Sequence, residues 1–167
     1  YNPQVRDKMR QQYHLEGKHV IGHVGRFMAQ KNHTFLLDVF AAYKKEDKDA
    51  YLVLLGDGEL METVKNKAKE LGVADSVLFV GNVGNANEWY QAFDVFMLPS
   101  IWEGLPVVGV EAQAADLQCI FSDNVTKEIG FLSFTACRYE QLGQRDTPKD
   151  ADDAESESGS TDYRESL

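Results

Sequence analysis

Residues 95–121 read V-F-M-L-P-S-I-W-E-G-L-P-V-V-G-V-E-A-Q-A-A-D-L-Q-C-I-F. The run Val95–Leu98 is continuously apolar and ends at Pro99, which predicts a short buried strand. Pro106 opens a predicted helix, because proline is well accommodated at the first helical position. A second apolar run, Gln118–Phe121, predicts another buried strand. A strand, a helix and a strand in this order form the repeating unit of a parallel sheet.

The same alternation extends toward the N-terminus. Apolar runs predict further strands at 19–24, 51–55 and 77–80, and helical spacing of apolar residues predicts helices at 32–46 and 59–71. Residues 87–93 fit a short helix, and the polar residues 4–14 could form another. The expected fold class is therefore α/β, a Rossmann-like parallel sheet with helices on both faces. Ligands of such sheets bind outside the carboxyl ends of the strands. The loops expected to hold a site are 25–31, 56–59, 81–87, 99–106 and 122–126.

Length and composition predict one folded domain. The chain has 167 residues, enough for a single core. Residues 1–17 are interpreted as a lead-in helix or linker, and residues 18–134 as the ligand-binding domain. Residues 135–167 are interpreted as an acidic, disordered or atypical C-terminal tail, because the run D-A-D-D-A-E-S-E-S-G-S-T-D within it is low in apolar residues and rich in charge, Ser and Gly.

Several functional classes are disfavoured. No basic stripe is available to neutralise nucleic acid phosphates. No apolar run is long enough for a membrane span, and the polar start does not resemble a signal peptide. Cys119 and Cys137 are two widely spaced cysteines, which predicts neither a metal site nor a disulfide framework. We therefore expect a cytoplasmic protein without metal ligands.

Two cations follow the first predicted strand. Arg26 and Lys31 lie in the loop G-R-F-M-A-Q-K at the ligand edge of the sheet. Cations at the start of a helix are electrostatically disfavoured, so their presence there favours a role in binding an anion. Arginine can make paired hydrogen bonds and lysine acts as a point charge, which suits a pyrophosphate.

Two carboxylates flank Pro106. Their spacing by itself says little, because the pairs 62/70 and 157/165 have the same separation. Their context says more. Glu103 follows a strand at the ligand edge, and Glu111 lies about 8 Å along the helix that begins at Pro106. Free amides at a helix start bind anions, so the two acids are expected to reach hydroxyls on either side of a bound phosphate. Together with Arg26 and Lys31, this predicts a nucleotide-diphosphate sugar.

The remaining polar features are less specific. The loop G-D-G-E at 56–59 lacks a phosphate-loop pattern and is interpreted as a turn with an acidic helix start. The two glycines of the loop 81–87 permit tight turns. The small residues of this loop could let a flat nucleobase lie against the backbone. The four histidines are interpreted as structural, with His33, at a loop–helix junction, the one to examine.

Several runs together resemble a known family. The runs G-R-F-M-A-Q-K, L-L-G-D-G-E-L, F-V-G-N-V, F-D-V-F-M-L-P-S-I-W-E-G-L-P-V-V-G-V-E-A-Q-A-A and S-D occur in this order between residues 18 and 129. They resemble the C-terminal, donor-binding domain of retaining family 4 glycosyltransferases (glycosyl transferases group 1), which is one half of a GT-B fold. The resemblance is strongest to bacterial enzymes that build capsular, exopolysaccharide or lipopolysaccharide chains.

The resemblance implies roles for matching residues. Arg26 and Lys31 would hold the diphosphate, Glu103 would contact the hexose, and Glu111 would bind the ribose. Val83 would lie beside the base. The full implied donor site consists of Gly25, Arg26, Lys31, Val83, Glu103, Gly104, Leu105, Pro106, Val107 and Glu111, of which Glu103, Arg26 and Lys31 would be catalytic.

The resemblance also implies the reaction and its setting. A hexose would pass from a UDP-sugar to a glycan or lipid-linked acceptor with retention of configuration, without a required metal or other cofactor. A front-face substitution is the mechanism usually argued for the family, so Glu103 need not be a nucleophile. The acceptor would bind an N-terminal domain that no part of this sequence resembles. The chain by itself is therefore expected to bind donor but to transfer little, and the whole enzyme to work in the cytoplasm, with peripheral membrane association possible.

The sequence departs from the family in three places. Asp116 and Gln118 stand where the family usually has glycine and proline, which predicts strain or a shifted turn after the helix. The match fades after Ile129, although 131–134 could be a remnant strand. Two alternatives stay open. One is another GT-B-like enzyme, such as an epimerase or a phosphorylase, and the other is a non-catalytic domain that binds nucleotide sugars or partner proteins.

Overall fold

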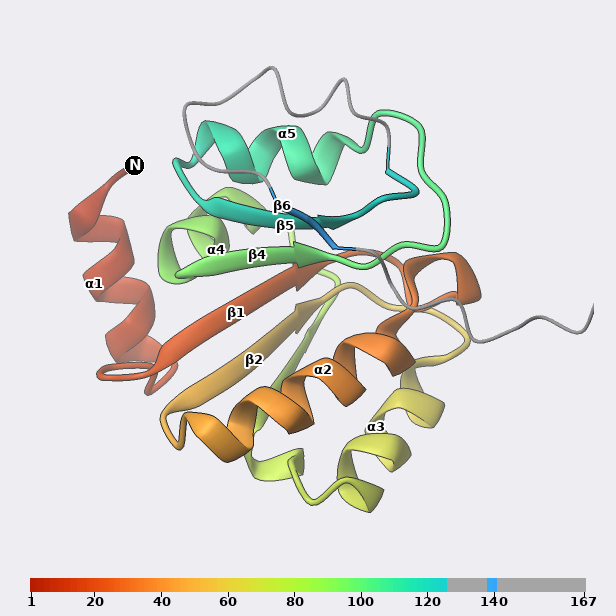
Figure 1. Cartoon of the computed structure of the whole chain (residues 1–167). Coiled ribbons are helices and arrows are strands. Elements are labelled where there is room, and N and C mark those ends of the chain that lie inside the picture. Colours follow the sequence, from red (N-terminus) through yellow and green to blue (C-terminus); the bar gives the residue numbers. More distant parts are fainter. Residues whose placement is uncertain (126–137, 141–167) are drawn as a thin grey trace, which may run out of the picture.

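A parallel six-stranded sheet forms the centre of the molecule. The computed structural model describes residues 1–125 and the backbone of residues 138–140. The strand order is β3-β2-β1-β4-β5-β6, and every pairing is parallel (Figure 1). The strands are β1 (His19–Val24), β2 (Ala50–Leu55), β3 (Val77–Gly81), β4 (Val95–Leu98), β5 (Gln118–Ser122) and β6 (Arg138–Glu140). The five strands predicted from apolar runs are confirmed.

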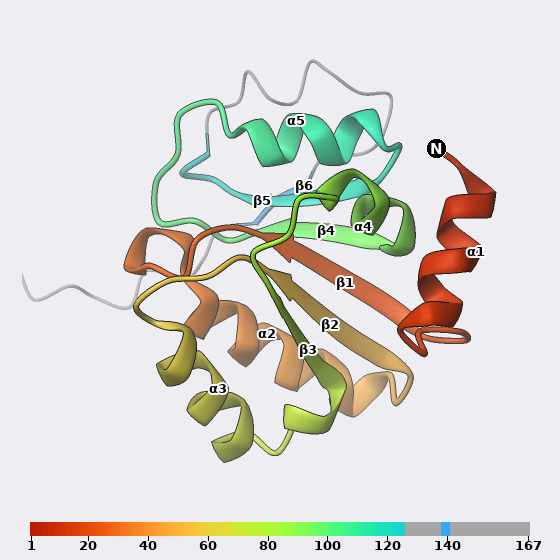
Figure 2. The same cartoon turned by 180° about the vertical axis from the view of Figure 1, so that it is seen from behind.

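Helices cover both faces of the sheet. Those of the described residues are α1 (Pro3–Gln12), α2 (His33–Glu46), α3 (Met61–Glu70), α4 (Ala86–Ala92) and α5 (Val107–Ala114), with short 3₁₀ turns η1 (Ala29–Lys31) and η2 (Ala74–Ser76). The helices α2 and α3 lie on one face, and α1, α4 and α5 lie on the other (Figures 1 and 2). The Rossmann-like α/β prediction is therefore confirmed.

Each face of the sheet has its own core. Under α2 and α3 the buried side chains include Ile21, Leu52, Leu54, Phe40 and Val64. Under α4 and α5 they include Val20, Val53, Phe93, Phe96 and Phe121. Alternate residues of one strand enter opposite cores, as the pleat requires. At Gly22 of β1 a Cβ atom would lie 2.0 Å from the Phe93 ring, so only glycine leaves room for that ring.

Helix α1 is fastened to the domain rather than being a loose lead-in. Arg6 donates hydrogen bonds to the carbonyls of Gln91 and Phe93, and both Arg6 and Arg10 pair with Asp94. The Asp94 carboxylate also accepts from the backbone N–H of Val20 at 2.7 Å. Burial would raise the pKa of Asp94, but its hydrogen bonds from Arg10, Val20 and Arg6 outweigh burial and leave that pKa lowered.

The turn after α5 carries the strain that the sequence predicts. Asp116 has φ +63°, the left-handed conformation that glycine adopts without cost. The helix itself begins one residue later than predicted. Pro106, with φ −78° and ψ 119°, is the extended residue that precedes the helix, and Val107 is the first helical residue.

The C-terminal part of the sheet differs from the sequence expectation. Strand β6 lies at 138–140, inside the range assigned to the acidic tail, and pairs with β5 from Ile120 to Ser122. These three residues are of mixed polarity and form no apolar run, so the search for apolar runs could not predict this strand. The remnant strand expected at 131–134 lies outside the described residues.

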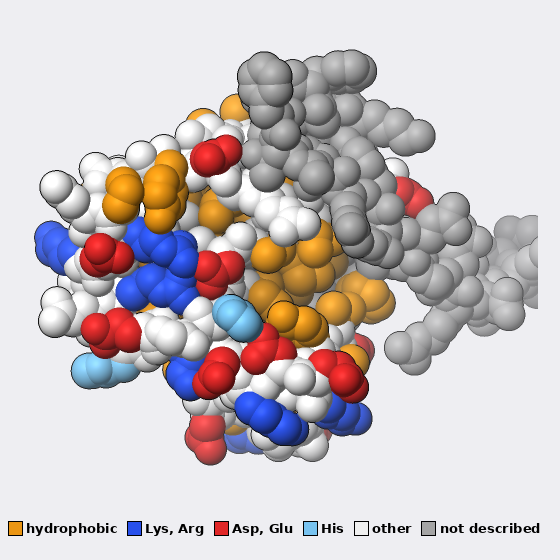
Figure 3. Space-filling view, turned by 60° about the vertical axis from the view of Figure 1, so that its left-hand side comes forward, with side chains coloured by type: hydrophobic (Ala, Val, Ile, Leu, Met, Phe, Trp, Pro, Cys, Tyr) orange, Lys and Arg blue, Asp and Glu red, His pale blue; other side chains and the backbone are white. Residues whose placement is uncertain are grey.

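The face viewed in Figure 3 carries acidic and basic side chains in alternation rather than a continuous patch of one sign. Hydrophobic side chains gather near the centre of the same face. No helix among the described residues is both long and apolar enough to cross a membrane.

Candidate donor-binding site

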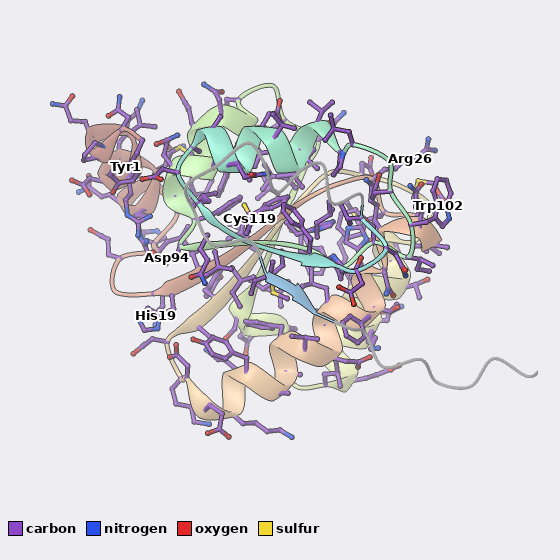
Figure 4. All side chains as sticks on the ribbon, turned by 45° about the horizontal axis from the view of Figure 1, so that its top comes forward. Tyr1, His19, Arg26, Asp94, Trp102 and Cys119 are labelled. Atoms are coloured by element: carbon purple, nitrogen blue, oxygen red, sulfur yellow. The ribbon has the colours of Figure 1, made fainter. Side chains whose placement is uncertain are left out.

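The predicted site loops meet at one end of the sheet. Arg26 and Trp102 lie at this end, whereas His19 and Asp94 lie at the other (Figure 4). A pocket of about 380 Å³ opens between the ends of β1, β2 and β3. Its lining consists of Val24, Gly25, Arg26, Leu55, Gly56, Asp57, Asn82, Val83 and Ala86. The structure therefore brings together Gly25, Arg26 and Val83, three residues of the predicted donor site.

The loop carrying Arg26 is braced by the loop at 56–58. The N–H of Gly25 donates to the carbonyl of Leu55, and that of Phe27 donates to the carbonyl of Asp57, both at 3.0 Å. Gly56 has φ +127°, and a Cβ atom there would lie 2.1 Å from the Gly25 carbonyl oxygen. The G-D-G-E loop, interpreted as a turn with an acidic helix start, therefore also holds the backbone at Arg26 in place.

The guanidinium of Arg26 faces solvent at the pocket. Its side chain is 71% exposed and lies 3.8 Å from the Glu59 carboxylate, which is also exposed. An exposed pair at this distance contributes little to stability. Arg26 is therefore available to an anion that enters the pocket.

Lys31 and Glu103 form an ion pair with each other. Their side chains are only 16% and 10% exposed. Ser100, which is fully buried, donates to the same Glu103 oxygen at 3.0 Å. The Lys31 ammonium and the Glu103 carboxylate, predicted to hold the diphosphate and the hexose, are thus paired across two loops that are 72 residues apart in sequence.

Glu111 lies on the α5 side of the site. Its carboxylate accepts a hydrogen bond from the Tyr90 hydroxyl of α4 at 2.9 Å. Burial raises the pKa of Tyr90, and the Glu111 hydrogen bond and charge raise it further. In the described part of the chain, the Glu111 carboxylate is hydrogen-bonded to Tyr90 and is separate from the Lys31–Glu103 pair. Tyr90 was not predicted, because an aromatic residue next to Trp89 on a short helix resembles an ordinary core residue.

Apolar side chains surround the start of α5. Ile101, Trp102, Leu105 and Val107 are all exposed, Trp102 to 63%. Pro106 is buried, and no side chain among the described residues caps the first amides of the helix. These amides, with those of Gly104 and Leu105 in the preceding loop, belong to the predicted donor site. Helix geometry leaves the first amides without intrahelical acceptors.

Two buried histidines lie beneath the loop that carries Lys31. His33 stacks on Phe27 with ring centroids 4.1 Å apart and meets His23 edge-on at 4.6 Å. The Nδ1 atom of His23 donates to the carbonyl of Met97 at 2.8 Å. Neither ring nitrogen of His33 has a hydrogen-bond partner among the residues that the structure describes. The interpretation of both histidines as structural fits this burial.

Burial lowers the pKa of both imidazoles, to about 4 for His23 and to about 2 for His33, with nearby Lys31 contributing in the same direction. The folded protein therefore holds them neutral while the unfolded chain takes up protons below its ordinary pKa of about 6.5. Stability is complete above that pH and is lost as the pH falls from 6.5 toward 4. We expect each histidine to contribute a slope of up to about 1.4 kcal/mol per pH unit.

Replacing His33 by phenylalanine tests this expectation. In urea unfolding between pH 7 and pH 5, the variant should lose about half of the slope that the two buried histidines contribute to the unfolding free energy, because one of the two is removed. The variant His19→Gln should not reduce the slope, because the hydrogen bond and charge of Asp47 raise the pKa of His19 and give its contribution the opposite sign. An unchanged slope in His33→Phe would contradict the assignment.

No cluster of three or more His, Cys, Asp or Glu side chains suited to a metal ion occurs within residues 1–125 and 138–140.

Comparison with known proteins shows the family of the chain. The family described as Glycosyl transferases group 1 matches residues 5–128. The chain is 46% identical over 110 residues to EpsF of Bacillus subtilis (strain 168), which is named as a glycosyltransferase, and the match covers 66% of this chain and 29% of EpsF. It is 38% identical over 104 residues to the UDP-Gal:alpha-D-GlcNAc-diphosphoundecaprenol alpha-1,3-galactosyltransferase of Escherichia coli, covering 60% of this chain and 27% of that enzyme.

A solved structure shares the fold. The Anabaena protein Alr3699/HepE, in complex with UDP-glucose, superposes with a TM-score of 0.71 at 21% identity, over 83% of this chain and 40% of that one. The chain spans less than a third of the length of the two curated relatives. The family match covers most of the chain and includes every predicted donor-site residue. The chain therefore belongs to the glycosyl transferases group 1 family, whose members have the GT-B fold.

Proposed function

We propose that this chain is the donor-binding part of a retaining glycosyltransferase, which takes a hexose from a UDP-sugar. The observation that carries the proposal is the meeting of two cations, a carboxylate and an uncapped helix start at one edge of the sheet. Arg26, Lys31 and Glu103 come from the loops after β1 and β4, and the helix is α5. Charge of both signs beside free amides suits a ligand that has a diphosphate and several hydroxyls.

The nucleotide would occupy the pocket beside Arg26. A volume of about 380 Å³ is within the range of small-molecule sites. In our proposal the base lies against Val83, the ribose hydroxyls donate to Glu111, and the diphosphate lies between Arg26 and the first amides of α5. Uridine is favoured because the Escherichia coli relative is named for UDP-Gal and the Anabaena protein is described with UDP-glucose.

Catalysis would be electrostatic. As the bond to the hexose breaks, negative charge grows on the leaving diphosphate. In our proposal Arg26, Lys31 and the α5 amides stabilise that charge, without a metal ion. Glu103 would accept hydrogen bonds from hexose hydroxyls and hold the sugar, rather than attack it.

The acceptor would be a glycan or a lipid-linked sugar. The name of the Escherichia coli relative includes a diphosphoundecaprenol acceptor, which supports this class. We assign acceptor binding to an N-terminal domain, as the GT-B fold requires a cleft between two domains. The chain studied by itself should then bind donor and transfer little or no sugar, and the whole enzyme should work at the cytoplasmic face of the membrane.

Calorimetric titration of the chain tests the proposal. UDP and UDP-sugars should bind. Titrations with GDP, ADP and pyridoxal phosphate test the alternative ligands. The variant Arg26→Ala should bind UDP about tenfold or more weakly, since a charge-assisted hydrogen bond contributes about 1.5–3 kcal/mol. The variant Glu111→Gln should also weaken UDP binding, because it removes the carboxylate assigned to the ribose.

Two surface variants serve as controls for charge alone. Lys45→Ala on α2 and Glu70→Gln on α3 change charge by the same amounts at exposed positions away from the pocket. Both should leave UDP affinity unchanged. If Arg26→Ala and Glu111→Gln bound UDP as the wild type does, the assigned site would be wrong. Preferential binding of pyridoxal phosphate would favour a phosphorylase-like protein.

A further inference from the structure

The Lys31–Glu103 ion pair ties two parts of the proposed donor site to each other. Lys31 is the cation assigned to the diphosphate, and Glu103 is the carboxylate assigned to the hexose. Without ligand, the Lys31 ammonium is paired with one Glu103 oxygen, and the Ser100 hydroxyl donates to the same oxygen. The diphosphate therefore competes with Glu103 for this ammonium.

The backbone under the pair is held in place. The N–H of Ile101 donates to the carbonyl of Gln30 at 2.8 Å, and the Gln30 side chain donates to the carbonyl of Trp102 at 3.0 Å. The Asn32 side chain donates to the carbonyl of Pro99, and the N–H of Glu103 donates to the carbonyl of Asn124. Since both loops are fastened, an arriving ligand can change the partners of the two side chains without separating the loops.

Burial makes the exchange of partners costly for Glu103. Its side chain is only 10% exposed, and a carboxylate that loses its cation in such surroundings is poorly compensated. If Lys31 turns to a phosphate oxygen, the Ser100 hydroxyl is the donor that remains to the Glu103 carboxylate within the described residues. Hexose hydroxyls would supply new donors to the carboxylate, whereas a free nucleoside diphosphate would supply none.

We infer that Glu103 makes the site discriminate between the intact nucleotide sugar and the free nucleoside diphosphate. Glu103 acts as a specificity-determining residue that penalises a diphosphate arriving without its sugar. After transfer, the affinity for the nucleoside diphosphate product falls, because Lys31 pairs with Glu103 again. This inference rests on the proposed function, since it takes the ligand to be a nucleotide sugar.

Titration of the chain with UDP and with a panel of UDP-glucose and UDP-galactose tests the inference. The variant Glu103→Gln keeps the side-chain volume and an acceptor for Ser100 but removes the charge that holds Lys31. We expect UDP to bind this variant about tenfold more tightly than the wild type. The UDP-sugar should gain nothing, so its affinity relative to UDP should fall about tenfold.

A second variant should shift the balance in the opposite direction. Ser100→Ala removes the remaining donor to Glu103, so UDP binding should weaken about threefold and UDP-sugar binding should weaken less. Glu59→Gln is the matched control, because it removes an acidic charge 3.8 Å from Arg26 at an exposed position. It should change both affinities by the same small factor.

The outcomes separate the inference from the proposed function. If the wild type binds UDP and UDP-sugars but Glu103→Gln leaves the ratio of their affinities unchanged, the inference is wrong and the proposed function stands. An unchanged ratio in Ser100→Ala would contradict the inference in the same way. If the wild type binds neither UDP nor a UDP-sugar, the proposed function fails, and the inference fails with it.

Discussion

Replacing Gly56 by alanine is expected to lower the free energy of unfolding by about 3 kcal/mol or more. The residue has φ +127°, and the added Cβ atom would lie 2.1 Å from the carbonyl oxygen of Gly25 and 2.9 Å from its carbonyl carbon. Both are backbone atoms, so no side-chain rotation can relieve the contact. Urea unfolding followed by circular dichroism measures the loss.

The matched control is Gly72→Ala. Gly72 also has a positive φ, +69°, but no atom of residues 1–125 lies within 4 Å of the position that its Cβ would take. This variant should cost only about 1 kcal/mol, the usual penalty for a left-handed residue other than glycine. Equal losses at the two positions would show that conformational strain alone, and not the close approach to Gly25, explains the effect.

Replacing Asp94 by alanine is expected to cost about 3 kcal/mol. Asp94 is half-buried and pairs with Arg6 and Arg10, and Arg10 has a side chain only 10% exposed. Without the carboxylate these cations would be left close together without their counter-charge, and the N–H of Val20 would lose its acceptor. Thermal or urea unfolding gives the change directly.

Asp49→Ala provides the comparison for Asp94. Asp49 pairs with Lys18, but its side chain is 63% exposed, and a pair of this kind contributes about 0–1 kcal/mol. A loss at Asp94 no larger than the loss at Asp49 would contradict the view that α1 is fastened by a buried charge cluster.

The strands could be predicted because each is a short continuous apolar run that ends at glycine, proline or a polar residue. A strand that is buried on both faces of a sheet needs apolar side chains at successive positions, as in Tyr51–Leu55. The apolar runs in the sequence therefore indicate which strands are buried. Strand β6 was not predicted, because Arg138, Tyr139 and Glu140 form no apolar run.

The sequence predicted which candidate residues lie at the same edge of the sheet better than it predicted which of them contact each other. Loops at the carboxyl ends of parallel strands must meet, so Arg26, Lys31 and Glu103 could be placed at one edge from the order of elements. Which of them pair could not be read from the sequence. The sequence suggested that Arg26 and Lys31 act together, whereas in the structure Lys31 turns to Glu103 and Arg26 stands in solvent. Side-chain choices of this kind depend on burial, which differs greatly between the two cations.

The two tryptophans of the chain lie in opposite surroundings. Trp89 is fully buried and packs against Tyr13, with ring centroids 4.3 Å apart, while Trp102 is 63% exposed in the loop that carries Glu103. An indole in an apolar interior fluoresces at shorter wavelength than one in water, and a dissolved quencher such as iodide reaches only the second. The intrinsic emission of this protein therefore contains two separable signals. The shorter-wavelength component follows the integrity of the core, and the quenchable component reports on the loop beside Glu103 without any attached dye.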